Sequence, residues 1–141
     1  MEPFLPPGFV TRRVATPLGQ MVYTDAPSAA VTGTPLVFLH SLGGGSSAYE
    51  WSQVFPALSF DHPIVAPDLL GWGASAHPPL KYEAEDYFQM FRSVLEQVSE
   101  PAVICATSLT ASLVVRLLTT WPADTAPLPV KGLFLVAPSG Y

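Results

Sequence analysis

The sequence predicts an α/β fold built on a mostly parallel sheet with helices on both faces. Four short apolar runs follow Pro35, and none shows the alternation of a half-exposed strand. Amphipathic helical patterns separate these runs. Buried strands alternating with helices are typical of βαβ crossovers, which bring parallel strands together in one sheet.

Composition bounds the chain to one domain and excludes some partners. Its 141 residues are 49% hydrophobic and 12% charged, so they can bury a core. The net charge is −5, with only six lysines and arginines. Such an acidic chain is poorly suited to the phosphate backbone of nucleic acid or to an anionic membrane surface. We therefore expect no nucleic-acid partner.

The first elements along the chain predict an antiparallel hairpin. Phe9–Ala15 and Gln20–Asp25 have an extended pattern, and the Pro- and Gly-containing segment Thr16–Gly19 between them suits a tight turn. Asp25–Thr34 is rich in small and turn-forming residues without any period, so we expect a loop there.

The remaining elements are predicted from apolar runs and helical periodicity. The buried strands are expected at Leu36–Leu39, Ile64–Ala66, Ala102–Ala106 and Leu133–Ala137. The helices are expected at Ala48–Leu58, Glu83–Val98 and Ala111–Trp121. Pro56 should end the first of these helices early or kink it.

The short segment Ala106–Thr110, made mostly of small residues, joins the third buried run to the third helix. A sharp strand-to-helix turn crowds the backbone on either side of its apex, and Ala106 and Thr110 are small enough to fit there. Ser108 occupies the apex. This layout is a nucleophile elbow, with the backbone N–H of Leu109 free to receive an oxyanion.

The glycine-rich loop His40–Ser47 permits two interpretations. In acyl transfer, such a loop supplies a backbone N–H, here that of Leu42, to a developing oxyanion. Alternatively, Gly43–Ala48 fits the dinucleotide pattern G-x-G-x-x-G/A, with Asp68 after the next strand as the ribose acceptor. The long loop after Asp68 favours a structural role for its carboxylate, as an acceptor from loop backbone.

Together, His40–Gly43, Asp68–Ser75 and the Ser108 elbow resemble the first half of an α/β hydrolase of the lipase, esterase and epoxide-hydrolase type. The resemblance covers the chain from about Phe9. It implies that Ser108 is the nucleophile, with the backbone N–H groups of Leu42 and Leu109 as the oxyanion hole. It also implies hydrolysis of a small, apolar ester-like or other acyl substrate through an acyl-serine, without metal or cofactor. A serine at the apex disfavours the branches that use a carboxylate nucleophile.

The chain also departs from the family pattern. Ser41, Ala106 and Thr110 stand where the family usually has glycine. In the family the acid and the histidine follow the serine, whereas all three histidines here precede Ser108. We therefore expect residues 1–141 to form a partial hydrolase domain, truncated after about strand six, with little or no turnover. A non-catalytic binding module and a dinucleotide-binding domain remain alternatives.

The other candidate groups have plainer interpretations. His40 is expected to be structural, His62 and His77 to lie at the surface, and Cys105 to be a buried core residue. A single cysteine, no signal-peptide pattern in the first residues and no spanning apolar segment suggest a cytoplasmic protein. If Leu133–Ala137 is the last strand, it leaves an open edge through which the chain could self-associate.

Overall fold

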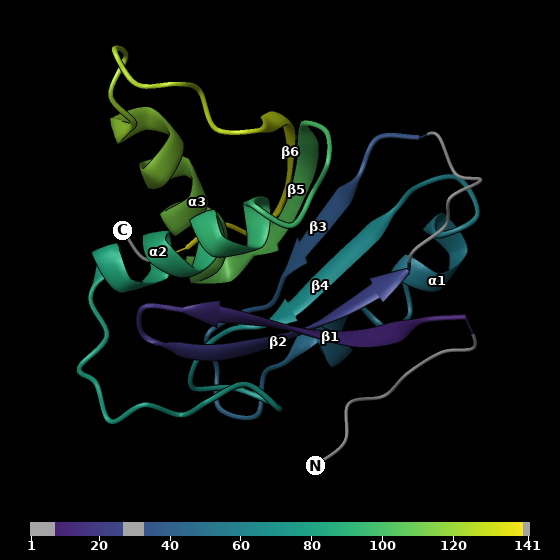
Figure 1. Cartoon of the computed structure of the whole chain (residues 1–141), viewed down its shortest axis with the longest axis horizontal. Coiled ribbons are helices and arrows are strands. Elements are labelled where there is room, and N and C mark those ends of the chain that lie inside the picture. The colour runs from purple at the N-terminus through teal and green to yellow at the C-terminus, as the bar shows by residue number, and fades with distance from the viewer. Residues whose placement is uncertain (1–7, 27–32, 140–141) are drawn as a thin grey trace.

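The computed structural model of the chain describes residues 8–26 and 33–139 and contains one mixed six-stranded sheet, as predicted (Figure 1). The strand order across the sheet is β1-β2-β4-β3-β5-β6. The strands are β1 (Val10–Thr16), β2 (Gly19–Ala26), β3 (Leu36–Leu39), β4 (Ile64–Asp68), β5 (Ala102–Thr107) and β6 (Val130–Val136).

The sheet is parallel from β4 to β6 and antiparallel at its N-terminal end. β1 and β2 form the predicted hairpin, and β2 also pairs antiparallel with β4. β3 lies between β4 and β5 and is parallel to both, and β5 is parallel to β6. The side-chain hydroxyl of Thr16 closes the hairpin turn by accepting from Gly19 N–H at 3.1 Å. The loop expected at Asp25–Thr34 begins later, because Asp25 and Ala26 belong to β2; residues 27–32 lie outside the described residues.

The helices agree with the sequence patterns except for the first. They are the 3-10 turn η1 (Ala48–Trp51) and the α-helices α1 (Phe55–Leu58), α2 (Ala84–Leu95) and α3 (Ser108–Thr120). The expectation of one helix over Ala48–Leu58 was wrong, because two separate turns fill this range. Pro56 lies in the first turn of α1, where its missing N–H removes no helical bond, so it begins a helix rather than ending one.

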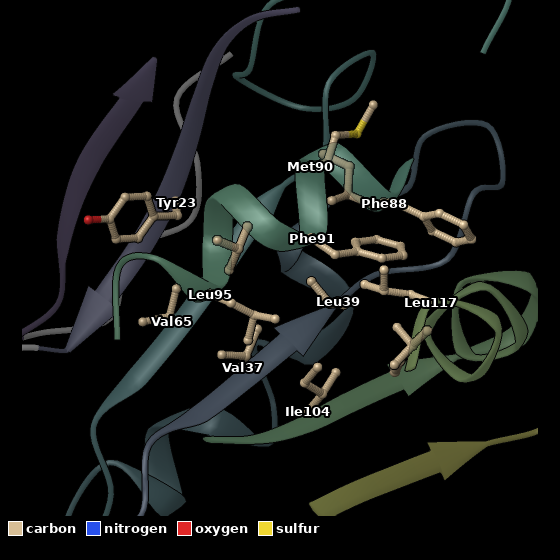
Figure 2. Packing of buried hydrophobic residues seen from close by; sticks show 14 of the residues in the cluster. Tyr23, Val37, Leu39, Val65, Phe88, Met90, Phe91, Leu95, Ile104 and Leu117 are labelled. Atoms are coloured by element: carbon tan, nitrogen blue, oxygen red, sulfur yellow. The ribbon is translucent and has the colours of Figure 1, made fainter. Parts of the chain in front are cut away.

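Two hydrophobic clusters pack on opposite faces of the sheet. On one face, α2 and α3 cover the side chains of Val37, Leu39 and Ile104, and Figure 2 shows Phe91 and Leu95 of α2 lying over these strands. On the other face, Phe38 packs against η1 and α1, with ring centroids 5.1 Å from Trp51 and 6.0 Å from Phe55. These clusters confirm that helices cover both faces of the sheet.

β6 differs from the other parallel strands. We expected its apolar run to be buried on both faces, but Leu133, Phe134 and Val136 are exposed. Among the described residues β6 pairs with β5 alone, so it is an edge strand with less apolar surface around it. No helix in the described part of the chain is long and apolar enough to cross a membrane.

Candidate active site

The sharp turn between β5 and α3 places Ser108 at the start of a helix. Thr107 is extended, with φ −132° and ψ 150°, and Ser108 follows with a φ of 57°. A left-handed conformation is unfavourable for any residue that carries a Cβ, by roughly 1–2 kcal/mol. Backbone strain of this kind persists only where the surrounding structure holds it, and such positions concentrate at functional sites.

The residues flanking the turn are buried. Ala106 and Thr110 are both fully buried, which agrees with the need for small side chains predicted from the sequence. The hydroxyl of Thr110 donates to the carbonyl oxygen of His40 at 2.7 Å. The threonine that replaces a glycine therefore ties the first turn of α3 to the loop that follows β3.

The hydroxyl of Ser108 contacts a residue that the sequence analysis missed. Its Oγ lies 3.0 Å from the Oγ of Ser139, just beyond β6. Two further bonds hold Ser139 there, since its N–H donates to the Ser108 carbonyl at 3.3 Å and its own carbonyl accepts from Ser112 Oγ at 2.5 Å. Ala137, with a φ of 46°, turns the chain back toward α3. The sequence held one signal for Ser139: it follows a strand expected to be parallel to the strand that leads into Ser108. Residues that follow neighbouring parallel strands lie at the same edge of the sheet.

The two residues expected to donate to an oxyanion occupy the elements that the sequence indicated. Leu109 is the second residue of α3, so no carbonyl within the helix can accept its N–H. Leu42 lies in the loop after β3, and its half-buried side chain packs against the core cluster beneath α2 and α3. The bond from Thr110 to His40 holds the start of the Leu42 loop beside the turn that carries Ser108 and Leu109.

His40 is structural, as expected, and is not a base for Ser108. Its Nε2 accepts from Leu69 N–H at 2.9 Å, so the ring proton sits on Nδ1 and is donated to the Ser41 carbonyl at 2.6 Å. The ring is completely buried. Burial lowers the His40 pKa, against smaller opposing effects of the Ser41 carbonyl and the Asp68 and Glu50 carboxylates.

Asp68 also has a structural role. It is 4% exposed, and its two carboxylate oxygens accept from the backbone N–H groups of Ala74 at 2.9 Å and Ala48 at 2.8 Å. The first bond lies within the loop that follows β4, and the second reaches η1. Asp68 thus joins η1, which follows the glycine-rich loop, to the loop after β4, and Trp72 links the two loops directly by donating from its indole to the Gly43 carbonyl at 3.0 Å.

This arrangement counts against the dinucleotide alternative. A ribose acceptor needs a free carboxylate, whereas both oxygens of Asp68 are already bonded to backbone. A pyrophosphate also needs the N-terminus of a substantial helix, whereas the glycine-rich loop leads into the four-residue 3-10 turn η1.

The other titratable candidates lie away from the Ser108 hydroxyl. His62 bonds the Thr34 carbonyl at 2.8 Å and is half-buried, and exposed His77 bonds the Gly73 carbonyl at 3.2 Å. Among the described residues, no histidine hydrogen-bonds to Ser108. Cys105 is buried, and desolvation raises its thiol pKa to about 11, so it carries little thiolate at neutral pH. Within residues 8–26 and 33–139, no cluster of His, Cys, Asp and Glu side chains could hold a metal ion.

A cavity of about 600 Å³ lies beside the site rather than at its centre. Tyr49, Phe55 and Trp72 contribute aromatic surface to its lining, but Ser108, Leu42 and Leu109 do not line it. Trp51, by contrast, is buried, and its indole donates to the Leu39 carbonyl at 3.1 Å.

The elbow, the glycine-rich loop and the strand order agree with a comparison against known families. The profile described as "Alpha/beta hydrolase family" matches residues 36–141. The chain belongs to this family. The hydrolase fold thus accounts for β3 to β6, and the hairpin β1–β2 precedes the matched range.

Curated and solved relatives place the chain within the hydrolase fold. A 1-acylglycerol-3-phosphate O-acyltransferase ABHD5 from Rattus norvegicus is 42% identical over 64 residues, which are 45% of this chain and 18% of the relative. The haloalkane dehalogenase DatA from Agrobacterium tumefaciens superposes with a TM-score of 0.76 at 21% identity, covering 94% of this chain and 42% of that one. A serine hydrolase involved in carbazole degradation, CarC, gives 0.77 at 20% identity, covering 94% and 49%.

These comparisons establish the fold and leave the reaction open. The chain spans less than half the length of either solved hydrolase, and its match covers less than a fifth of the curated acyltransferase. A dehalogenase and a serine hydrolase superpose almost equally well, so similarity of fold does not choose between their chemistries. The choice depends on the residues of the site.

Proposed function

We propose that this chain carries the nucleophile and oxyanion hole of a serine-type α/β hydrolase that cleaves an ester-like or other acyl bond. The observation that carries the proposal is Ser108, a non-glycine residue with a φ of 57° where β5 turns into α3. An elbow of this kind presents a hydroxyl at the carboxyl end of a parallel sheet. A serine hydroxyl at the apex suits acyl transfer, for which an acyl-serine is the covalent intermediate.

In this reaction Ser108 Oγ would attack the substrate carbonyl carbon and lose its proton to a base. A carbon–oxygen bond forms, and the carbonyl electron pair moves to oxygen. The N–H groups of Leu42 and Leu109 would stabilise that oxyanion. Collapse expels the leaving group, which takes up a proton, and water then releases the acid and regenerates the serine. Exposed Leu109 and half-buried Leu42 place apolar side chains next to these donors, which supports a small apolar substrate.

We further propose that these 141 residues alone turn over little or no substrate. Among the described residues the bonded neighbour of the Ser108 hydroxyl is the hydroxyl of Ser139, which is too weak a base to take its proton. A serine without a base is a weak nucleophile, and loss of a triad member costs several orders of magnitude in rate.

Labelling with an alkyl fluorophosphonate tests Ser108 as the nucleophile, because the reagent phosphonylates activated serine hydroxyls. We expect slow labelling confined to Ser108, identified by mass spectrometry of peptides, and its loss in Ser108→Ala. Ser99→Ala is the control, since Ser99 is exposed and lies before β5, at the opposite end of that strand from Ser108. A folded chain in which Ser108 never reacts would contradict the proposal.

A non-catalytic binding module is the second candidate, and the contact between Ser108 and Ser139 favours it. In such a module the pocket would bind an ester-like ligand without forming a bond to Ser108. Saturable binding of an aryl ester by calorimetry, equally tight in Ser108→Ala, in a chain whose Ser108 does not react with the fluorophosphonate, would support the module and contradict the nucleophile.

We also propose that the chain works in the cytoplasm. Support comes from Cys105, a free and buried thiol that a reducing compartment preserves. Cell fractionation of the tagged chain tests the location, and recovery from the medium or the membrane fraction would contradict it.

A further inference from the structure

We propose that Glu50 is the positioning residue for the loop that presents the Leu42 N–H, here called the oxyanion loop (residues 40–47). The inference rests on the proposed function, because it assigns to Glu50 the task of holding one of the two oxyanion donors in place. It is carried by the contacts of the Glu50 carboxylate, which lies on η1 immediately after the loop.

The Glu50 carboxylate forms hydrogen bonds with polar groups near both ends of this loop. Glu50 Oε2 accepts from the Ser41 N–H at 2.7 Å. Glu50 Oε1 accepts from the hydroxyl of Ser41 and lies 3.2 Å from the hydroxyl of Ser46. The two serine oxygens are themselves 2.9 Å apart.

Each serine hydroxyl has a single proton to donate, which fixes the donor and the acceptor in these hydrogen bonds. An ionised carboxylate only accepts, so the Ser41 hydroxyl donates its single proton to Glu50. The Ser41 oxygen is then free to accept, and the Ser46 hydroxyl at 2.9 Å can donate to it. The chain of bonds runs from Ser46 through Ser41 to Glu50, and its charged end makes it stronger than a bond between neutral groups.

The loop needs these hydrogen bonds to stay ordered, because its glycines make the backbone flexible. Gly43–Gly45 lose more backbone entropy on ordering than any other residues would. Leu42 is held on either side of its own backbone: Ser41 is fixed by Glu50, and the Gly43 carbonyl accepts the Trp72 indole N–H at 3.0 Å. An oxyanion donor is effective only if it is already in place when charge develops.

The same contacts explain why Ser41 stands where the family usually has glycine. A glycine would keep the N–H bond to Glu50 but would lose the hydroxyl that bonds both Glu50 and Ser46, leaving only the direct contact between Glu50 and Ser46 at 3.2 Å. The serine and the carboxylate therefore act together, and we expect their substitutions to be non-additive.

The test compares Glu50→Gln with Glu96→Gln, a matched loss of an exposed carboxylate at the far end of α2. The first readout is amide hydrogen exchange of Ser41 by NMR, because the Ser41 N–H is bonded to Glu50. We expect exchange to rise about tenfold in Glu50→Gln, the size of one charge-assisted bond, and to stay at the wild-type rate in Glu96→Gln. Ser41→Gly should also raise it, and the double variant should exceed neither single one by much.

The second readout is the rate at which the fluorophosphonate labels Ser108, which we expect to fall about tenfold in Glu50→Gln while the chain stays folded by circular dichroism. Unchanged exchange at Ser41 in Glu50→Gln overturns the positioning role, even if the wild-type chain labels normally. Increased exchange in a chain whose Ser108 never labels supports the positioning of the loop and contradicts the proposed nucleophile. The two proposals can therefore fail separately.

Discussion

The hydroxyl oxygens of Ser108 and Ser139 lie 3.0 Å apart, although 31 positions separate the two residues in the sequence. The contact joins the first turn of α3 to the chain just beyond β6. It depends on Ala137, whose φ of 46° reverses the direction of the chain after the strand. Ser108 is therefore held from the edge of the sheet as well as from β5.

Ser112, rather than Ser139, should contribute most of the stability of this connection. The Ser112 hydroxyl is buried and donates to the Ser139 carbonyl at 2.5 Å, whereas the Ser139 side chain is exposed. We expect Ser112→Ala to lower the free energy of unfolding by about 1 kcal/mol and Ser139→Ala by less than about half of that. Urea unfolding followed by circular dichroism measures both, and a larger loss in Ser139→Ala would contradict this ranking.

A second prediction concerns Gly73, which combines a left-handed φ of 53° with very close packing. A Cβ at this position would lie 2.3 Å from Asp68 Oδ2. Gly45 is the matched control, because its φ is 79° but a Cβ added there would meet no atom within 4 Å. We expect Gly45→Ala to cost about 1 kcal/mol from backbone strain alone.

Gly73→Ala should cost about 3 kcal/mol, because the displaced Asp68 carboxylate also loses its fit to the N–H groups of Ala48 and Ala74. Chemical denaturation of both variants gives the difference. Equal losses would mean that the carboxylate moves away at little cost and that its bonds to Ala48 and Ala74 contribute little to stability.

The third prediction is a pH dependence that originates at His40. Burial lowers its pKa in the folded protein below the value near 6.5 of an unfolded histidine. Below about pH 6.5 the unfolded chain binds a proton that the folded chain does not, so stability falls as the pH falls through this window. Above it, the contribution of His40 is fully present.

His40→Gln should flatten this part of the profile, because glutamine can accept from Leu69 N–H and donate to the Ser41 carbonyl without titrating. The measurement is the urea midpoint between pH 5 and pH 8 in both proteins. His62→Gln is the control, since His62 is only half-buried. If the urea midpoint of His40→Gln falls with decreasing pH as steeply as that of the wild-type chain, titratable groups other than His40 cause the pH dependence.

Much of this fold follows from the sequence because burial leaves a direct pattern. β3 is found within the predicted bounds, since a strand covered on both faces reads as an unbroken apolar run. The elbow is equally visible, because only small residues fit beside its apex, and Ala106 and Thr110 are indeed fully buried. In contrast, the break between η1 and α1 could not be predicted from the sequence, because Pro56 is compatible with either the end or the start of a helix.

The supporting residues of the site were beyond the sequence for a different reason. The contact from Ser139 to Ser108 depends on a left-handed alanine, which local preference argues against. The contacts of Glu50 depend on the loop conformation, and a carboxylate in a helical first turn is usually just solvated. Both residues act through hydrogen bonds, which leave no periodic signal.

The last prediction concerns β6, whose outer edge has no strand beside it among residues 8–26 and 33–139. Unpaired backbone groups on an apolar edge form a template for another strand, so we propose that the chain self-associates through β6. Phe134 is 59% exposed on this strand. Phe134→Lys should favour the monomer, because a charged side chain on an edge strand opposes strand addition.

Phe60→Lys provides the control, since Phe60 is 81% exposed but lies after α1, away from the edge. Sedimentation velocity should show a mass that rises with concentration for the wild-type chain and for Phe60→Lys, and a monomer for Phe134→Lys. If both variants lose association equally, exposed aromatic surface causes it rather than the strand edge. A wild-type chain that stays monomeric at tens of micromolar would remove the basis for strand pairing through β6.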